Sequence, residues 1–169
     1  MSYSDLTTMA DVPNKEVADA LAEVGRLLAE QGANPYRARA YEQAALLEVD
    51  REYREKAASG QLYRITPRLQ NPHRDAWLPV LHTHRGERHY TALFSNTPRA
   101  HQLGMTGDWV VIYYDGAGRP ERQCTVITAR FGPLAGQRVV RGREGECASH
   151  YAQTSSSDQP AAARAARRS

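Results

Sequence analysis

The chain has 169 residues, of which 41% are hydrophobic and 24% are charged. This composition is close to that of average globular proteins, so it excludes a wholly disordered chain and supplies enough apolar side chains for a core. No stretch approaches the roughly 18 apolar residues that cross a membrane, and no signal-peptide pattern is visible at the N-terminus. Two cysteines are too few for a disulfide framework, and we expect a cytoplasmic protein with reduced thiols.

Charge is distributed unevenly along the chain. Residues 1–60 carry 7 basic and 11 acidic side chains, whereas residues 61–169 carry 15 basic and 8 acidic ones, and every basic residue except Lys15 and Lys56 is arginine. Arginine forms bidentate contacts with phosphate and stacks on flat rings, so a positive C-terminal part suits a polyanion. The codon bias of a GC-rich genome also enriches arginine, so the pI near 9.0 does not by itself establish a binding surface.

Two helices are predicted after a flexible leader at residues 1–13. Asn14 is a good N-cap for the first helix, and Gly32 suits its C-terminal end because glycine tolerates a positive φ. An apolar stripe with steps of three and four residues runs along this helix: Val17, Ala20, Leu21, Val24, Leu27 and Leu28. The simplest packing is an antiparallel hairpin with the second helix.

The second helix starts at Asn34-Pro35 and meets no breaker before Gly60, so residues 35–59 form one long helix or two in succession. Its apolar stripe can be supplied by Tyr36, Ala40, Tyr41, Ala44, Leu47 and Tyr53. Oppositely charged (i, i+4) pairs are expected to support it, namely Asp50 with Arg54, Arg51 with Glu55, and Glu52 with Lys56.

The periodicity then changes from that of a helix to that of strands. Residues 77–83 and 88–94 flank a short turn at Arg85-Gly86, which predicts a β-hairpin. Pro79 places the first of these strands at a sheet edge, because proline has no N–H to donate to a neighbouring strand.

Further along, Ser95-Asn96-Thr97-Pro98 is typical of a helix start, and Gly104 of the end of a short helix. Residues 108–114 predict the most strongly buried strand, and residues 122–130 its partner across a tight turn. The remaining predicted elements are a strand at 137–141 and a closing helix at 143–151.

These elements predict an α+β fold, in which an N-terminal helical pair precedes a mostly antiparallel β-sheet of about five strands with one or two short helices. The expected segments are a flexible leader (1–13), a helical domain (14–60), a basic linker (61–76), a β-rich domain (77–152) and a disordered basic tail (153–169).

No pattern of residues predicts an enzyme. His82 and His84 share a strand face, as zinc ligands would, but no Cys-x-x-Cys or His-x-x-x-His spacing accompanies them. Cys124 and Cys147 are interpreted as small apolar residues of a strand and a helix. There is no phosphate-binding glycine loop, and the β region holds no paired carboxylates for magnesium. We therefore expect no catalytic residue, no metal and no cofactor.

Two groups of residues could bind an anion. A strand that ends at a helix N-terminus presents free N–H groups, and Ser95, Asn96, Thr97 and Arg99 at such a place could hold a phosphate or a carboxylate. The same residues serve equally in plain helix capping. The second group, Arg138, Arg141 and Arg143, lies partly on opposite strand faces and predicts only a weak patch.

Residues 14–45 resemble the opening helices of the N-terminal DNA-binding domain of family X DNA polymerases, a helix-hairpin-helix domain. The resemblance is carried by Asn14-Lys15-Glu16-Val17, by the leucines Leu21, Leu27 and Leu28, by Gly32, by Asn34-Pro35-Tyr36-Arg37 and by Arg39-Ala40-Tyr41. Residues 50–151 are similar to the C-terminal module of bacterial helix-hairpin-helix proteins that begin in this way. The segments that carry this similarity are 50–60, 76–83, 89–97, 108–114 and 132–144.

This resemblance implies DNA binding, with one departure. The family's Leu-Pro-Gly-Ile-Gly type of hairpin, whose backbone N–H groups hold DNA phosphates, does not occur in this sequence, and Glu42 and Gln43 stand where the family often has basic residues. Arg37 and Arg39 are kept, and Tyr41 matches a recurring tyrosine of the family. Nucleotidyl transfer is not implied, because no catalytic domain is present.

We therefore expect a non-catalytic DNA-binding or DNA-repair accessory protein that contacts phosphates without reading bases. The side chains expected to touch DNA are Arg37, Arg39, Tyr41, Arg64 and Arg68, with the arginines of the tail. The alternative is a protein-interaction module that docks the apolar face of its N-terminal helices on a partner and has no role with nucleic acid. No membrane partner is expected.

Overall fold

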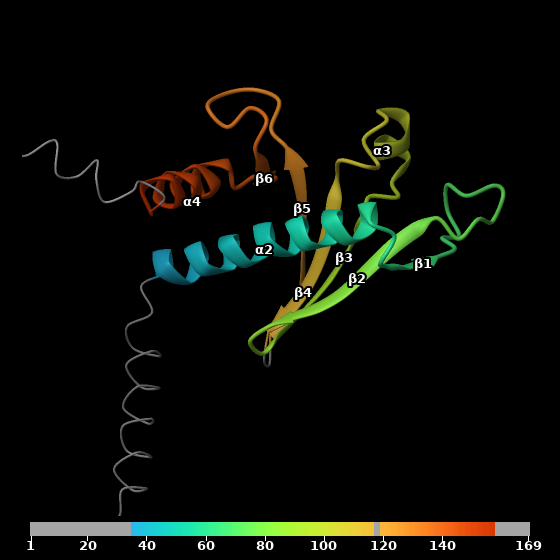
Figure 1. Cartoon of the computed structure of the whole chain (residues 1–169), viewed down its shortest axis with the longest axis horizontal. Helices are drawn as coiled ribbons and strands as arrows, with labels where there is room; N and C mark the ends of the chain where they lie inside the picture. Colours follow the sequence, from blue (N-terminus) through green and yellow to red (C-terminus); the bar gives the residue numbers. More distant parts are fainter. Residues whose placement is uncertain (1–34, 117–118, 158–169) are drawn as a thin grey trace, which may run out of the picture. The chain divides into compact units, whose positions relative to one another are not determined.

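One long helix crosses a six-stranded antiparallel sheet (Figure 1). Two shorter helices complete the described part of the chain. The computed structural model describes residues 35–116 and 119–157, so the predicted leader, the first predicted helix and residues 158–169 of the predicted tail lie outside the described part. The chain divides into two units, residues 1–38 and 39–169, and the sheet with the helices packed on it belongs to the second.

The α+β class predicted from the sequence is confirmed, with six strands instead of about five. The elements follow in the order α2 (Pro35–Ala58), β1 (Tyr63–Ile65), β2 (Leu78–Arg85), β3 (Arg88–Phe94), α3 (Pro98–Gln102), β4 (Val110–Gly116), β5 (Arg119–Thr128), β6 (Arg138–Val140) and α4 (Glu144–Ser157).

Each strand pairs antiparallel with the next one along the chain, so the sheet order is β1-β2-β3-β4-β5-β6. The predicted β2–β3 hairpin is confirmed: Arg85 pairs with Arg88, and Gly86 adopts a φ of 59° in the turn between them. Thr97 caps α3 through a hydroxyl that accepts from the Ala100 N–H at 3.2 Å, with Pro98 at the start of the helix as predicted.

The additional strand, β1, lies within the segment predicted to be a linker. It has three residues and pairs Arg64 with Pro79 of β2. The prediction that Pro79 marks an edge strand is therefore wrong, because β2 lies between β1 and β3. In an antiparallel strand, the N and C=O of one residue face the same neighbour. The Pro79 carbonyl faces the β3 side, so the pairing with β1 requires no N–H from this proline.

The Tyr53 hydroxyl links Pro79 of β2 to Phe94 of β3, where the two strands make no backbone hydrogen bond with each other. It donates to the Pro79 carbonyl at 2.9 Å and accepts from the Phe94 N–H at 2.8 Å, just beyond the point where the regular β2–β3 pairing ends at Val80 and Leu93. The Tyr53 side chain is fully buried, and its ring meets that of Phe94 edge to face at 4.9 Å. One side chain of α2 thus supplies the hydrogen bonds that the strands lack.

We expect Tyr53→Phe to lower the free energy of unfolding by about 2 kcal/mol, because it leaves a buried carbonyl and a partly buried N–H without partners. Urea unfolding followed by circular dichroism measures this loss. Tyr63→Phe is the matched control, since Tyr63 is 76% exposed and should change stability by less than about 0.5 kcal/mol. Equal stabilities of the two variants would contradict the bridging role of the Tyr53 hydroxyl.

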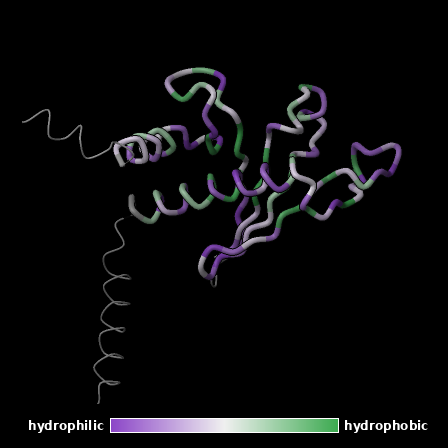
Figure 2. The backbone as a smooth tube through the Cα atoms, in the orientation of Figure 1, coloured by the Kyte–Doolittle hydropathy of each residue, from purple (hydrophilic) through white to green (hydrophobic). Residues whose placement is uncertain are grey.

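The apolar face of α2 packs on the sheet and forms the core with it. Its buried residues recur at helical spacing: Gln43, Leu46, Leu47, Val49, Asp50 and Tyr53. The predicted stripe was partly wrong, because Tyr41 is 76% exposed and Leu46 and Val49 are fully buried. In Figure 2 the β2–β3 turn and the β1–β2 loop are hydrophilic, whereas the strands beneath α2 carry the hydrophobic residues. The sheet thus covers this face of α2, and the first predicted helix, which the alternative of a protein-interaction module also uses, lies outside the described residues.

The closing helix, α4, runs beyond its predicted end into the segment expected to be a tail. Its Cys147 is fully buried, where the thiol accepts from the Gln43 amide at 2.7 Å and from the Val140 N–H at 3.3 Å. Farther along the helix, the Tyr151 hydroxyl donates to the Arg138 carbonyl at 2.8 Å. These contacts hold α4 against β6 and α2.

Candidate nucleic-acid interface

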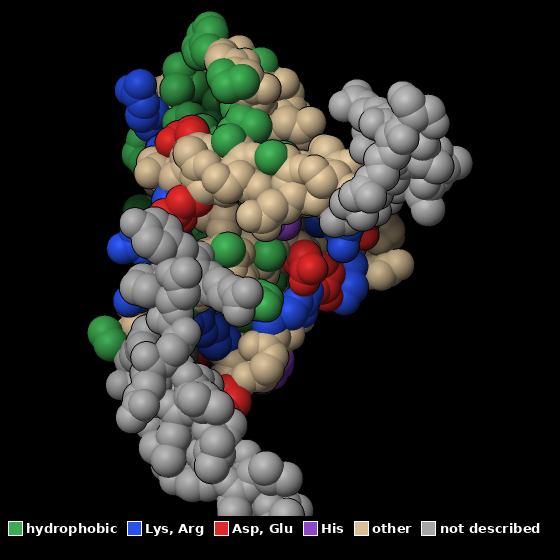
Figure 3. Space-filling model, turned by 90° about the vertical axis from the view of Figure 1, so that its left-hand side faces the viewer, with side chains coloured by type: hydrophobic (Ala, Val, Ile, Leu, Met, Phe, Trp, Pro, Cys, Tyr) green, Lys and Arg blue, Asp and Glu red, His purple; other side chains and the backbone are tan. Residues whose placement is uncertain are grey.

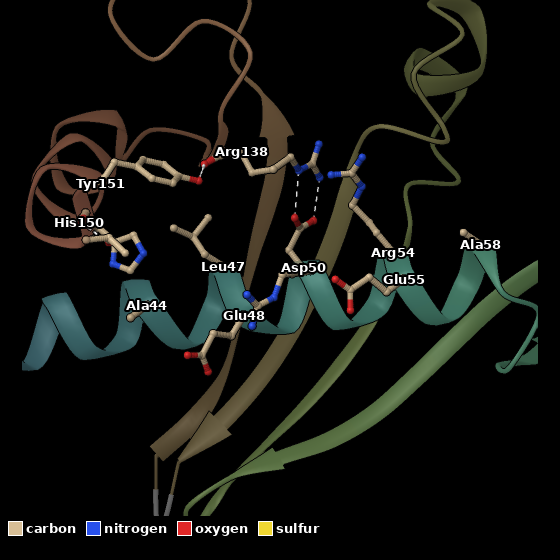
Figure 4. Close-up of a pocket in the computed structure, with 12 residues that line it drawn as sticks. Ala44, Leu47, Glu48, Asp50, Arg54, Glu55, Ala58, Arg138, His150 and Tyr151 are labelled. Atoms are coloured by element: carbon tan, nitrogen blue, oxygen red, sulfur yellow. Dashed lines mark hydrogen bonds and ion pairs between the residues drawn. The ribbon is translucent and has the colours of Figure 1, made fainter. Parts of the chain in front are cut away.

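Most of the arginines on the sheet are neutralised by carboxylates. Arg138 of β6 donates to Asp50 of α2 from Nε at 2.9 Å and from Nη2 at 2.7 Å, and its Nη1 reaches Asp108 at 2.8 Å. Figure 4 shows the two parallel bonds between Arg138 and Asp50 above α2. Burial acts to raise the pKa of Asp108, but hydrogen bonds from Thr128 and the charge of Arg138 outweigh it and hold this pKa below its usual value.

A second network surrounds Glu42 with three arginines from different elements. The carboxylate accepts from Tyr114 Oη at 2.8 Å, from Arg143 at 3.0 Å and from Arg88 at 3.3 Å, and Arg122 lies at 3.7 Å. Burial opposes ionisation of Glu42, yet these donors lower its pKa overall. Glu42 is therefore the acidic centre of an ion cluster formed with Arg88, Arg122 and Arg143.

Only one of the three predicted (i, i+4) ion pairs of α2 is formed. Lys56 lies 2.6 Å from Glu52, which also binds Arg85 at 2.6 Å. Asp50 faces the sheet and pairs with Arg138 instead of Arg54. The predicted cluster of Arg138, Arg141 and Arg143 also separates, because Arg141 lies over the Trp109 ring at 4.4 Å while the other two join the networks described above.

Arg51, Arg54 and Arg64 are exposed, and no carboxylate in residues 35–116 or 119–157 lies within ion-pair distance of them. Members of this group line two grooves. The first, the α2–α4 groove, has a volume of about 680 Å³ and is lined by α2, α4 and Arg138 (Figure 4). Its three arginines face an equal number of carboxylates, Glu48, Asp50 and Glu55, so this groove has no excess charge for a polyanion.

The second groove lies between the C-terminal half of α2, the first two strands and the loop before β4, and we name it the helix–sheet groove. It has a volume of about 490 Å³, and its lining includes Arg54, Arg64, Trp77, Pro79, Phe94 and Thr106. Its described lining contains two arginines and no carboxylate. The charge of Arg54 acts on Asp108, which is itself bound by Thr128 and Arg138. The lining of this groove is therefore positively charged, and Arg54 also borders the α2–α4 groove with its three carboxylates.

The residues predicted to touch DNA do not form a single cluster. The side chain of Arg37 lies outside the described part, as do the arginines of the predicted tail. Arg39 and Tyr41 are exposed near the start of α2, and Arg39 precedes Arg54 by about 22 Å along the helix axis. Arg64 joins Arg54 in the helix–sheet groove, whereas Arg68 is exposed in the β1–β2 loop and does not line it.

The side chains of the predicted anion site bind one another and the backbone. Ser95 is buried and its hydroxyl lies 3.2 Å from that of Thr97, which caps α3. Asn96 donates to the Leu69 carbonyl at 2.8 Å and contacts His101 Nε2 at 2.7 Å. Arg99 is exposed. The structure thus gives Thr97 the capping role, and anion binding at this place stays a prediction.

The histidines and cysteines form no cluster with the composition of a metal site within the described residues. His84 and His89 pair across the β2–β3 hairpin with ring centroids 3.9 Å apart, and His82 contacts Thr91 at 3.0 Å. Burial raises the pKa of the Cys124 thiol to about 12, so this thiol is protonated at neutral pH. The nucleophilic form of cysteine is the thiolate, and Cys124 is therefore unsuited to nucleophilic attack.

Basic and acidic side chains lie next to one another on the face shown in Figure 3, in keeping with these ion networks. Among the helices in the described ranges, none combines the length and hydrophobicity that a bilayer span requires. Comparisons of the chain with protein-family models, with curated proteins and with solved structures returned no match.

Proposed function

We propose that this chain is a non-catalytic DNA-binding protein, acting as an accessory in DNA binding or repair, and that it contacts phosphates without reading bases. The observation that carries the proposal is the helix–sheet groove, where Arg54 and Arg64 approach from different elements and the described lining supplies no carboxylate. Guanidinium groups are well suited to phosphate oxygens because their N–H groups form a planar fork.

The absence of a carboxylate in its described lining separates this groove from the arginines of the ion networks. Arg85, Arg88, Arg122, Arg138 and Arg143 hold carboxylates of the same chain, so an incoming phosphate would have to displace those partners. Within residues 35–116 and 119–157, no carboxylate lies within ion-pair distance of Arg54 or Arg64, so a phosphate would displace no such partner there. The resemblance of residues 14–45 to a polymerase DNA-binding domain supports the same class of ligand.

We expect the double substitution Arg54→Gln and Arg64→Gln to weaken binding of a fluorescein-labelled 20-nucleotide single strand by about tenfold or more at about 0.15 M salt. Fluorescence anisotropy gives the dissociation constants. Arg130→Gln with Arg141→Gln is the matched control, because it removes the same charge outside the helix–sheet groove.

At this ionic strength charges more than about 8 Å apart are largely screened, so the control variant should bind within about twofold of the unmodified chain. Equal losses in both double variants would show that the helix–sheet groove has no special role. No uptake of DNA by the unmodified chain, even at low salt, would reject DNA binding altogether.

A further inference from the structure

The helix–sheet groove holds an aromatic ring and a hydroxyl group in addition to its two arginines. Trp77 is partly exposed in the lining, and the His101 ring meets it edge to face with centroids 5.9 Å apart. His101 is itself held by Asn96 at 2.7 Å, and Asn96 is anchored to the Leu69 carbonyl. The indole is thus positioned by a chain of contacts, which favours a fixed stacking platform.

Thr106 carries a polar atom that has no partner. Its Oγ1 is buried and makes no hydrogen bond to the described residues, although Thr106 lines the groove. Buried hydroxyl groups are normally hydrogen-bonded, so this one retains a donor that no group of the described residues uses. The volume of about 490 Å³ is within the range of small-molecule sites.

We propose that the helix–sheet groove binds one unpaired nucleotide of a single DNA strand, with the base stacked on Trp77. Its phosphates lie at Arg54 and Arg64, and the Thr106 hydroxyl donates to a ligand oxygen. This inference rests on the proposed function and deepens it, since it assigns a preference for single strands. A base inside a duplex is already stacked and paired, so it presents no free face to an indole.

The chain has two tryptophans, so Trp109→Phe leaves Trp77 as the sole source of tryptophan fluorescence. We would titrate this variant with a 12-nucleotide oligothymidylate, with a blunt duplex of the same length and with an abasic strand, while anisotropy of labelled copies reports binding. Stacking on the indole should quench the Trp77 emission by about half or more with the oligothymidylate. The duplex and the abasic strand should leave the emission unchanged.

Two further variants test the roles of the individual groups. Trp77→Leu should lower the affinity for the oligothymidylate by about tenfold and leave the affinity for the abasic strand unchanged. Phe131→Ala is the control, because it removes an exposed ring outside the groove, and it should change neither affinity. Thr106→Val should lower affinity several-fold without lowering thermal stability, because the hydroxyl has no partner in the protein.

The outcomes separate this inference from the proposed function. Binding of the oligothymidylate by anisotropy with no change in Trp77 emission would overturn the stacked nucleotide and leave phosphate binding intact. Equal binding and equal quenching by duplex and single strand would overturn the preference. Absence of binding to all three ligands would reject both proposals. If Trp77→Leu fails to fold, the quenching of the Trp109→Phe variant still decides the question.

Discussion

Asp50→Ala is expected to destabilise the fold by about 3–5 kcal/mol, the largest stability loss of any substitution considered. The Asp50 side chain is only 1% exposed and receives two hydrogen bonds from Arg138. Without it, the largely buried guanidinium of Arg138 keeps a single carboxylate, Asp108, on its Nη1 atom. A charge left partly uncompensated in a region of low dielectric constant costs several kcal/mol.

Urea unfolding at neutral pH measures this effect, with Glu55→Ala as the control. Glu55 lies on the same helix, is exposed and has no ion pair within the described residues, so its loss should change stability by less than about 0.5 kcal/mol. The combined substitution Asp50→Leu and Arg138→Met should recover much of the loss, because it removes both charges together. A cost below about 1 kcal/mol for Asp50→Ala would contradict the central position of this pair.

Glu42→Gln should lower the free energy of unfolding by about 3 kcal/mol at pH 7, because it leaves three guanidinium groups around a neutral side chain. The glutamine keeps the shape and can still accept from Tyr114, so the loss reports the charge. Arg88, Arg122 and Arg143 would then repel one another across the end of the sheet.

The same cluster predicts a pH dependence of defined sign. The pKa of Glu42 is lower in the folded chain than in the unfolded one, so its contribution is complete above the unfolded pKa, near 4.3, and is lost as pH falls through the folded pKa. The stability difference between the unmodified chain and Glu42→Gln should therefore shrink below about pH 4. Glu48→Gln, at a 57% exposed side chain, is the control. If the difference in free energy of unfolding between the unmodified chain and Glu42→Gln stayed constant from pH 7 to pH 3, the stabilising role of the Glu42 carboxylate would be contradicted.

The elements that could be predicted from the sequence are those fixed by local patterns. The β2–β3 hairpin follows from two alternating runs around Gly86, and α3 from the Thr97-Pro98 start, because each pattern acts within a few residues. β1 could not be predicted, since three residues in a proline-containing segment carry no detectable period and gain their structure from β2. Pro79 was misassigned because the Tyr53 hydroxyl bridges the Pro79 carbonyl and the Phe94 N–H, a contact between distant segments that lets β2 lie inside the sheet.

The candidate site depended on such distant contacts even more strongly. Helical spacing pairs Asp50 with Arg54, and only the fold shows that Asp50 binds Arg138 and leaves Arg54 available. Arg64 was singled out from the sequence, but the other groove residues Trp77 and Thr106 were not. Trp77 directly precedes β2 and Thr106 lies in the loop before β4, and neither belongs to a recognisable motif. Arg39 and Tyr41 were selected by resemblance and lie elsewhere on α2.

The salt dependence of single-strand binding tests the central claim most directly. Each phosphate neutralised by a protein cation adds about 0.7 to the slope of log K against log salt for a single strand. The Arg54→Gln and Arg64→Gln variant should therefore show a slope smaller in magnitude by about 1.4 than that of the unmodified chain, while the Arg130→Gln and Arg141→Gln control keeps the original slope. An unchanged slope in the first variant would mean that the helix–sheet groove holds no phosphates.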